Sequence, residues 1–208
     1  MLATDQSKMM LDQLRAKIHQ IRNHDIQIEQ WDANHGIPEN IRAPVDVIFS
    51  NFGAVNCLDN LQDLEARLSP ILKVGGHIVF TLMGRFCLWE TIAGLKRLQP
   101  ELLLRRPRGR ALWNNPAARP LPVTYHSPDA IKKVFKSPYR VSLCKGIGVS
   151  LPPTYLFPFL ERHPRLSQIL QTIEKHIWRW PLSWSISDHY LIVLKKEHNA
   201  TDSVEKIS

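Results

Sequence analysis

The positions of apolar residues define one clear unit near the middle of the chain, at residues 45–84. It opens with an almost wholly apolar run at 45–50, which is typical of a strand covered on both faces. A second such run follows a Gly-Gly stop, at 78–83. Strand, helix and strand in this order predict a βαβ unit with two parallel strands, and ligands bind at the carboxyl ends of such strands. The helix between the runs is indicated by leucines at helical spacing: Leu61, Leu64, Leu68 and Leu72.

Helical spacing and alternation mark further elements on either side of this unit. The predicted helices cover residues 7–22, 86–98 and 164–180, with one more starting at Ser127-Pro128 and a short one capped by Thr154. The predicted strands cover residues 26–31, 139–149 and 189–195. The Arg- and Pro-rich stretch at 100–122 is predicted to be irregular, with a hairpin that pairs 102–104 with 123–125. Strands that alternate with helices place the chain in the α/β class.

Length and composition favour a single domain. A chain of 208 residues with 44% hydrophobic content can bury most of its unfolded surface in one core. We expect one domain at 1–196 and a flexible tail at 197–208. Insertions at 85–122 and 152–182 would lie on the substrate side.

The formal net charge of +8 is concentrated in two stretches, 97–119 and 132–145. A basic surface can bind nucleic acid, but charge alone is not specific. The stretch 105–119 could hold phosphate or RNA, with Trp113 stacking on a base. A surface that binds nucleic acid usually carries several aromatic side chains among its cations. Because this stretch has one, we favour the interpretation that it is a solvated flap beside the substrate.

Several kinds of site have no signature in this sequence. The nine histidines include no HExxH motif and no cluster at metal-ligand spacing, so no metal is expected. No G-x-S-x-G nucleophile motif is present. Cys57, Cys87 and Cys144 are far apart, which favours a reducing compartment. No apolar run approaches the ~20 residues that span a bilayer, and we expect a cytoplasmic protein.

Three segments, met in a fixed order, resemble the class I S-adenosylmethionine-dependent methyltransferases with a methyltransferase type 11-like domain. They are LATDQSKMML at 2–11, DVIFSNFGAVN at 46–56 and LSPILKVGGHIVFTLMG at 68–84. The resemblance runs from residue 2 to 195. It implies a Rossmann-like, mostly parallel sheet with helices on both faces. It also implies S-adenosyl-L-methionine as cofactor and a small-molecule methyl acceptor as substrate, with nucleic acid an unlikely partner.

The resemblance assigns a cofactor role to seven residues. Asp5, at the end of a strand, would accept hydrogen bonds from the ribose hydroxyls, and it could at the same time start an Asp-x-Ser helix cap. Asp32, with Ala33 behind it, would meet the adenine amine, unless it is an ordinary loop aspartate after a strand. Phe52 would line the methionine end unless it packs in the core, and Gly53 would let the backbone come close. No catalytic residue is assigned, because the chemistry mainly requires alignment. The candidate cofactor residues are Asp5, Gln6, Asp32, Ala33, Asn51, Phe52 and Gly53.

A general base would help if the acceptor is a hydroxyl or a carbon acid. The side chains considered for this role are Tyr125, His126, His163 and His189. A histidine or tyrosine near an apolar run is more often structural, so none is selected.

The first strand and the Gly-rich turn of the resembling family have no counterpart, since only four residues precede Asp5. That strand would lie between the strands that end at Asp5 and at Ser50. Its absence leaves backbone groups unpaired, at about 1–3 kcal/mol for each buried group. We therefore expect impaired cofactor binding in a chain that is N-terminally truncated, decayed or completed by another polypeptide. The alternatives are a non-catalytic interaction role and an RNA-modifying methyltransferase.

Overall fold

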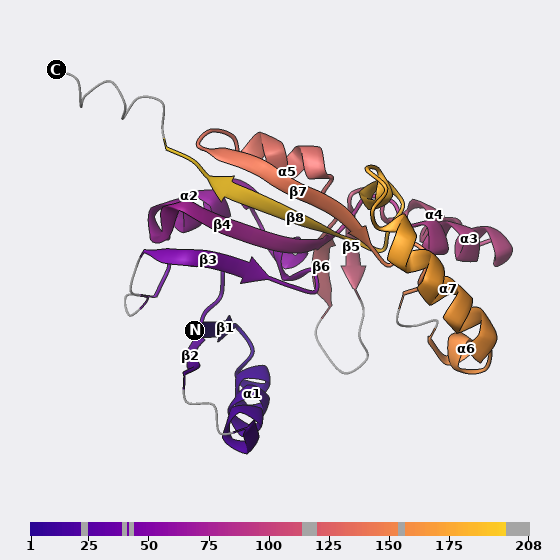
Figure 1. The fold of residues 1–208 in the computed structure, drawn as a ribbon, viewed down its shortest axis with the longest axis horizontal. Coiled ribbons are helices and arrows are strands. Elements are labelled where there is room, and N and C mark those ends of the chain that lie inside the picture. Colours follow the sequence, from indigo (N-terminus) through magenta and orange to yellow (C-terminus); the bar gives the residue numbers. More distant parts are fainter. Residues whose placement is uncertain (22–24, 39–40, 42–43, 114–119, 154–156, 199–208) are drawn as a thin grey trace.

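The computed structural model describes residues 1–21, 25–38, 41, 44–113, 120–153 and 157–198 (Figure 1). Its strands are β1 (Leu2–Asp5), β2 (Gln27–Gln30), β3 (Val45–Ser50), β4 (Leu72–Met83), β5 (Arg110–Trp113), β6 (Leu121–Thr124), β7 (Tyr139–Ile147) and β8 (His189–Lys196). Its helices are α1 (Lys8–Ile21), α2 (Leu61–Ile71), α3 (Leu88–Lys96), α4 (Pro100–Arg105), α5 (Pro128–Val134), α6 (Phe157–Glu161) and α7 (Pro164–Ile177), with 3₁₀ turns η1 (Ala54–Cys57) and η3 (Ser183–Ser185). The elements predicted outside 100–122 are present, with ends that shift by a few residues. Thr154 and residues 199–208 of the predicted tail lie outside the described residues.

The centre of the fold is a four-stranded sheet in the order β3-β4-β8-β7. β3 and β4 are parallel, with Ile48 opposite Ile78 and Ser50 opposite Phe80, as the βαβ pattern predicts. β8 runs antiparallel to both β4 and β7. The α/β class is therefore confirmed. The late strands make the sheet mixed, which is common in large α/β sheets.

One face of the central sheet packs against α2 and α5 and forms the core. Alternate residues of β4 and β8 point to this face, as strand geometry requires, and none of them is more than 1% exposed. Phe80 meets Phe135 edge to face, with ring centroids 5.7 Å apart. Burying side chains of this size contributes about 1.5–3 kcal/mol each. The residues concerned are Ile78, Phe80, Leu82, Tyr190, Ile192 and Leu194.

β3 lies at the edge of this sheet, and one of its faces is open. Val47 and Phe49 point away from the core and are 55% and 62% exposed. The expectation that this strand is covered on both faces is therefore wrong. The outer edge of β3 pairs with no described strand, and β1 and β2 form a separate parallel pair on that side (Figure 1). The strands that the resemblance places in one sheet therefore form two sheets, β1-β2 and β3-β4-β8-β7.

The stretch 100–122 is more regular than the sequence indicated. A hairpin is present, but it is formed by β5 and β6, with Ala111 opposite Val123. Residues 102–104 belong to α4 instead, so their predicted pairing with 123–125 is wrong. Three consecutive leucines show neither the alternation of a strand nor the spacing of a helix, so the sequence pattern does not distinguish the two. Pro100 favours the helix, because proline is common in the first turn. Residues 114–119 lie outside the described part of the chain.

The turn between α3 and α4 holds a leucine where glycine is the usual residue. Leu98 has a φ of 50°. Its N–H donates to the Leu95 carbonyl at 3.2 Å, and the Gln99 N–H donates to the Gly94 carbonyl at 2.9 Å. This pair of bonds defines a Schellman motif, with Leu98 at the left-handed position. The Leu98 side chain is 87% exposed, so little packing offsets the backbone strain.

Replacing Leu98 with glycine is therefore expected to stabilise the protein by about 1 kcal/mol, because glycine adopts this conformation without a steric cost. The shift of the urea midpoint at unchanged slope measures the gain. Leu98→Ala is the matched control: it also removes the side chain but keeps a Cβ, and it should change little. A glycine variant that is less stable than the alanine variant would show that the motif is not strained.

Candidate functional site

A tight turn follows β3 at the carboxyl end of the parallel pair. Phe52 and Gly53 both have left-handed backbone conformations, with φ of 53° and 74°. The Gly53 N–H donates to the Thr81 carbonyl of β4 at 3.1 Å. A Cβ at Gly53 would lie 3.1 Å from the Met83 side chain, so glycine is favoured both by conformation and by space. Phe52 is 86% exposed, which excludes the core-packing interpretation of this side chain.

Asn56 holds this turn to its neighbours, and the sequence analysis gave it no role. Its side chain is fully buried in η1. The amide Nδ2 donates to the carbonyls of Met83 at 3.0 Å and Thr124 at 2.7 Å. The Oδ1 accepts the Met83 N–H at 2.9 Å. One amide therefore holds η1, which follows β3, to the ends of β4 and β6. Its sequence signal was its place at the end of the 46–56 segment, directly after the turn.

The ends of β1 and β2 place two predicted carboxylates at one edge. Asp5 ends β1, and its backbone carbonyl accepts the Trp31 N–H at 3.1 Å. The Asp5 Oδ1 accepts the Ser7 N–H at 2.7 Å, which forms the predicted Asp-x-Ser turn directly before α1, and the Ser7 Oγ accepts the Met10 N–H of the first helical turn at 3.4 Å. The neighbouring Gln6 is exposed, and its carbonyl accepts the side chain of Gln30 at 3.0 Å.

The loop after β2 is tied to the β3 side of the fold. Asp32 accepts the Asn34 N–H at 2.9 Å and contacts His35 at 3.2 Å. Asn34 in turn accepts the Asp59 N–H at 2.9 Å. The carbonyl of Ala33 accepts the Arg67 guanidinium of α2 at 2.6 Å. The loop with Asp32 and Ala33 is thus anchored beside the segment that follows the Asn51–Gly53 turn.

A cavity of about 530 Å³ lies between η1 and the β5–β6 hairpin. Its walls combine apolar side chains with the cation of Arg110 and the carboxylate of Asp59. The carbonyl of Thr124, which Asn56 binds, belongs to the same wall. The cavity therefore adjoins the end of β4, and its volume is in the range of small-molecule sites.

The Arg-rich insertion contains a buried ion-pair network that the sequence analysis missed. Arg106 is 4% exposed and donates to Glu90 of α3 at 2.8 Å. It also contacts the Asp188 carboxylate and donates to the Asp188 carbonyl at 2.6 Å. Arg105 pairs with the same glutamate at 2.7 Å. At Arg106 the solvated-flap interpretation is wrong, because this arginine fastens α3 and α4 to the start of β8.

The ion pairs of this network shift the pKa values of Arg106 and Asp188. Burial alone would lower the pKa of Arg106, but the hydrogen bond and charge of Glu90 outweigh it and raise the pKa. Burial would likewise raise the pKa of Asp188, but His189 and Arg106 lower it. Burial raises the pKa of the nearby Cys87 thiol to about 11. Cys87, Glu90 and Asp188 lie within 4.8 Å of one another, but two arginines already balance the two carboxylates, so we assign this cluster to structure.

The four side chains considered as general bases have different surroundings. His189 is paired to Met83 at the end of β4, and its Nδ1 lies 3.0 Å from Asp188. Burial lowers the pKa of His126, and the ring of Tyr125 lies 5.4 Å from the Arg106 guanidinium. His163 lies on the surface between α6 and α7. None of these positions establishes a catalytic role.

Glu174 of α7 fastens the segment after β7. Its carboxylate accepts backbone N–H groups from Gly148, Val149, Ser150 and Leu151, at 2.7–3.3 Å, and the Ser150 hydroxyl at 2.7 Å. Burial would raise the pKa of Glu174, but these hydrogen bonds lower it.

The tryptophans near the carboxyl end of α7 are not in the core: Trp178 lines a shallow groove beside Gly146, and Trp180 is exposed.

Replacing Glu174 with glutamine is expected to cost about 2 kcal/mol at neutral pH, because an amide cannot accept all these donors. The pKa of Glu174 is lower in the folded state than in the unfolded state. The stability that its charge contributes is therefore fully present above the unfolded-state pKa and is lost as the pH falls through the folded-state pKa. Urea unfolding of both proteins from pH 7 to pH 3 should show the two curves converging. Curves that stay parallel would contradict the role of the charge.

Comparison with known proteins identifies solved structures that have a similar fold. No protein-family profile matches the chain, and no curated protein is similar to it in sequence. Among solved structures, a putative S-adenosylmethionine-dependent methyltransferase from Listeria monocytogenes aligns with a TM-score of 0.60 at 12% identity, over 95% of this chain and 80% of that one. A methyltransferase of the same kind from Methanosarcina mazei gives 0.56 at 8%, over 95% and 82%.

The complex between the Haloferax volcanii Trm112 methyltransferase activator and a putative methyltransferase gives a TM-score of 0.54 at 15% identity, over 95% of this chain and 72% of that one. These likenesses show that the chain has the class I S-adenosylmethionine-dependent methyltransferase fold. The fold that the three sequence segments implied is thereby confirmed.

Proposed function

We propose that this protein transfers a methyl group from S-adenosyl-L-methionine to a small molecule. The observation that supports it best is the shared place of the predicted cofactor residues. Asp5, Asp32 and the Asn51–Gly53 turn all follow the carboxyl ends of parallel strands, where α/β folds bind ligands. The cofactor, when bound, supplies an already activated methyl group.

The residues at these strand ends fit the parts of that cofactor. A carboxylate can accept more than one hydrogen bond, so Asp5 can bind ribose hydroxyls while it accepts the Ser7 N–H, and Asp32 can bind the adenine amine. The exposed ring of Phe52 and the close backbone of Gly53 would hold the methionine end. Their task is to orient the cofactor and to exclude water.

The cavity beside η1 supplies a place for the acceptor. Its apolar lining and Arg110 favour a small apolar or anionic molecule. Because Asn56 holds the cavity wall and the end of β4 in one frame, an acceptor there would lie beside the methionine end of the cofactor.

The cofactor site needs a further strand to be complete. The facing edges of β1 and β3 are unpaired among the described strands, and Val47 and Phe49 stay exposed. An apolar strand with a Gly-rich turn, from a completing polypeptide, would pair with both edges and add donors for the cofactor. Without it we expect weak binding and little activity. A cytoplasmic location is part of the same proposal.

An amide-resolved NMR titration with S-adenosylhomocysteine tests the placement of the cofactor. Shifts are expected at residues 5–7, 32–34 and 51–53, and Asp32→Asn should remove those at 32–34. Inosine, which keeps a ribose but carries a carbonyl in place of the adenine amine, is the control ligand for residues 32–34. Shifts confined to other segments, or equal shifts at 32–34 with inosine, would refute the proposed site.

A further inference from the structure

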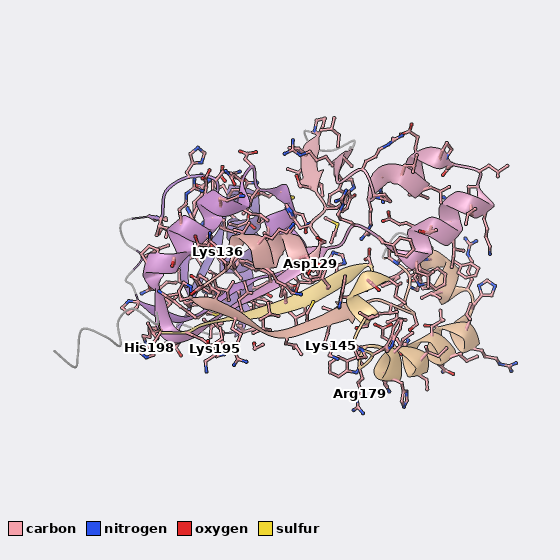
Figure 2. The ribbon with its side chains drawn as sticks, turned by 90° about the horizontal axis from the view of Figure 1, so that it is seen from above. Asp129, Lys136, Lys145, Arg179, Lys195 and His198 are labelled. Atoms are coloured by element: carbon pink, nitrogen blue, oxygen red, sulfur yellow. The ribbon has the colours of Figure 1, made fainter. Side chains whose placement is uncertain are left out.

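Two helical hairpins, α3–α4 and α6–α7, form one end of the molecule, and we call them the helical end. Both views place them together, beyond the carboxyl end of β4 (Figures 1 and 2). Neither α4 nor α7 has a buried residue. Much of the surface of these helices is therefore open to an external partner.

The helical end and its flanks are strongly basic. Residues 85–113 and 157–182 contain eleven Lys and Arg against four Glu, a net +7 compared with +8 for the whole chain. Two of these glutamates are turned inward: Glu90 to the buried arginines and Glu174 to the backbone N–H groups after β7. The charge that faces outward is thus almost entirely positive.

Large apolar side chains stand among these cations. Leu98 is 87% exposed between the α3 and α4 helices, directly after the exposed Lys96 and Arg97. A leucine that is both exposed and held at positive φ breaks two local preferences at once, which is typical of positions kept for function. The other exposed apolar side chains of the helical end include Leu95, Phe157, Phe159, Ile169 and Ile173.

We propose that the helical end docks on a bilayer surface that contains anionic lipids. Cations and large apolar side chains on the same segments are the chemistry of helices that lie in a membrane interface. Negative headgroups complement the net +7. Nucleic acid would satisfy the cations, but it binds through stacking on flat rings and offers little to exposed aliphatic side chains such as Leu98 and Ile169. In the described ranges no helix has the length and apolarity of a membrane span, so the contact is peripheral.

Vesicle flotation of the 208-residue chain tests this proposal. The probes are vesicles of phosphatidylcholine alone and of phosphatidylcholine with phosphatidylserine. We expect binding to the phosphatidylserine vesicles that weakens with salt, and little binding to the others. Lys96→Glu with Arg97→Glu should lower the partition coefficient about tenfold or more. Leu98→Gly should lower it about tenfold although this variant folds at least as stably.

The matched control is Lys136→Glu with Lys195→Glu, an equal change of charge at the opposite end (Figure 2). It should leave the partition coefficient within about twofold. The proposal is overturned if phosphatidylserine vesicles are not bound, or if the control pair weakens binding as much as the Lys96 and Arg97 pair. Binding that Leu98→Gly leaves unchanged, together with salt-sensitive retention of RNA, would assign the helical end to nucleic acid instead.

Discussion

Replacing Arg106 with methionine is expected to lower the free energy of unfolding by about 3–5 kcal/mol, which is the cost of removing one partner of a buried ion pair. The guanidinium joins Glu90 to Asp188, and both carboxylates would stay in place without it. A loss of this size is comparable with the whole margin of many domains, about 5–15 kcal/mol. Urea unfolding at pH 7 measures it.

Arg108→Met is the matched control, because Arg108 reaches Glu101 only at 3.8 Å on the surface. We expect it to change stability by less than about 0.5 kcal/mol. Adding Asp188→Asn to Arg106→Met should recover part of the loss, since Arg105 still pairs with Glu90 and Asp188 is the carboxylate left without an arginine. A loss below about 1 kcal/mol for Arg106→Met would contradict the network.

Asn56→Ala is expected to cost about 3 kcal/mol and to loosen the turn that carries Phe52. The change leaves two partly buried carbonyls and one N–H without their partner, and a fully buried unsatisfied group costs about 1–3 kcal/mol before local relaxation. Amide shifts at residues 51–53 should accompany the loss, because the Met83 backbone that supports this turn is no longer held.

Asn60→Ala provides the comparison for Asn56. Asn60 only caps α2, through one bond to the Gln62 N–H at 2.9 Å, and its removal should cost about 1 kcal/mol. If the two alanine variants are equally stable, Asn56 does not hold η1 to the ends of β4 and β6.

Much of the fold could be predicted because it rests on local patterns. The apolar runs at 45–50 and 78–83, with the leucine stripe between them, define a parallel pair by themselves. Ser127 and Pro128 start α5 as expected, and Ser127 accepts the Ala130 N–H at 3.2 Å. These signals lie within a few residues of the structure that they determine.

The features that escaped prediction depend on partners far away in the chain. Arg106 belongs to a stretch that looks solvated, and its burial depends on Glu90 and on Asp188, which is 82 residues away. The antiparallel direction of β8 also has no local signal. Asn56 resembles any loop asparagine until the strand ends that it joins are known. The seven cofactor residues remain predictions from the resemblance, because their places are compatible with binding and do not establish it.

We propose that this chain presents one wall of a cofactor site, in which no described strand lies between β1 and β3. Calorimetric titration of the 208-residue chain with S-adenosyl-L-methionine tests this most directly. The account predicts no saturable heat, or a dissociation constant of about 1 mM or weaker, equivalent to about 4 kcal/mol. Saturable binding in the micromolar range would contradict it, because the site would then be complete without a further strand.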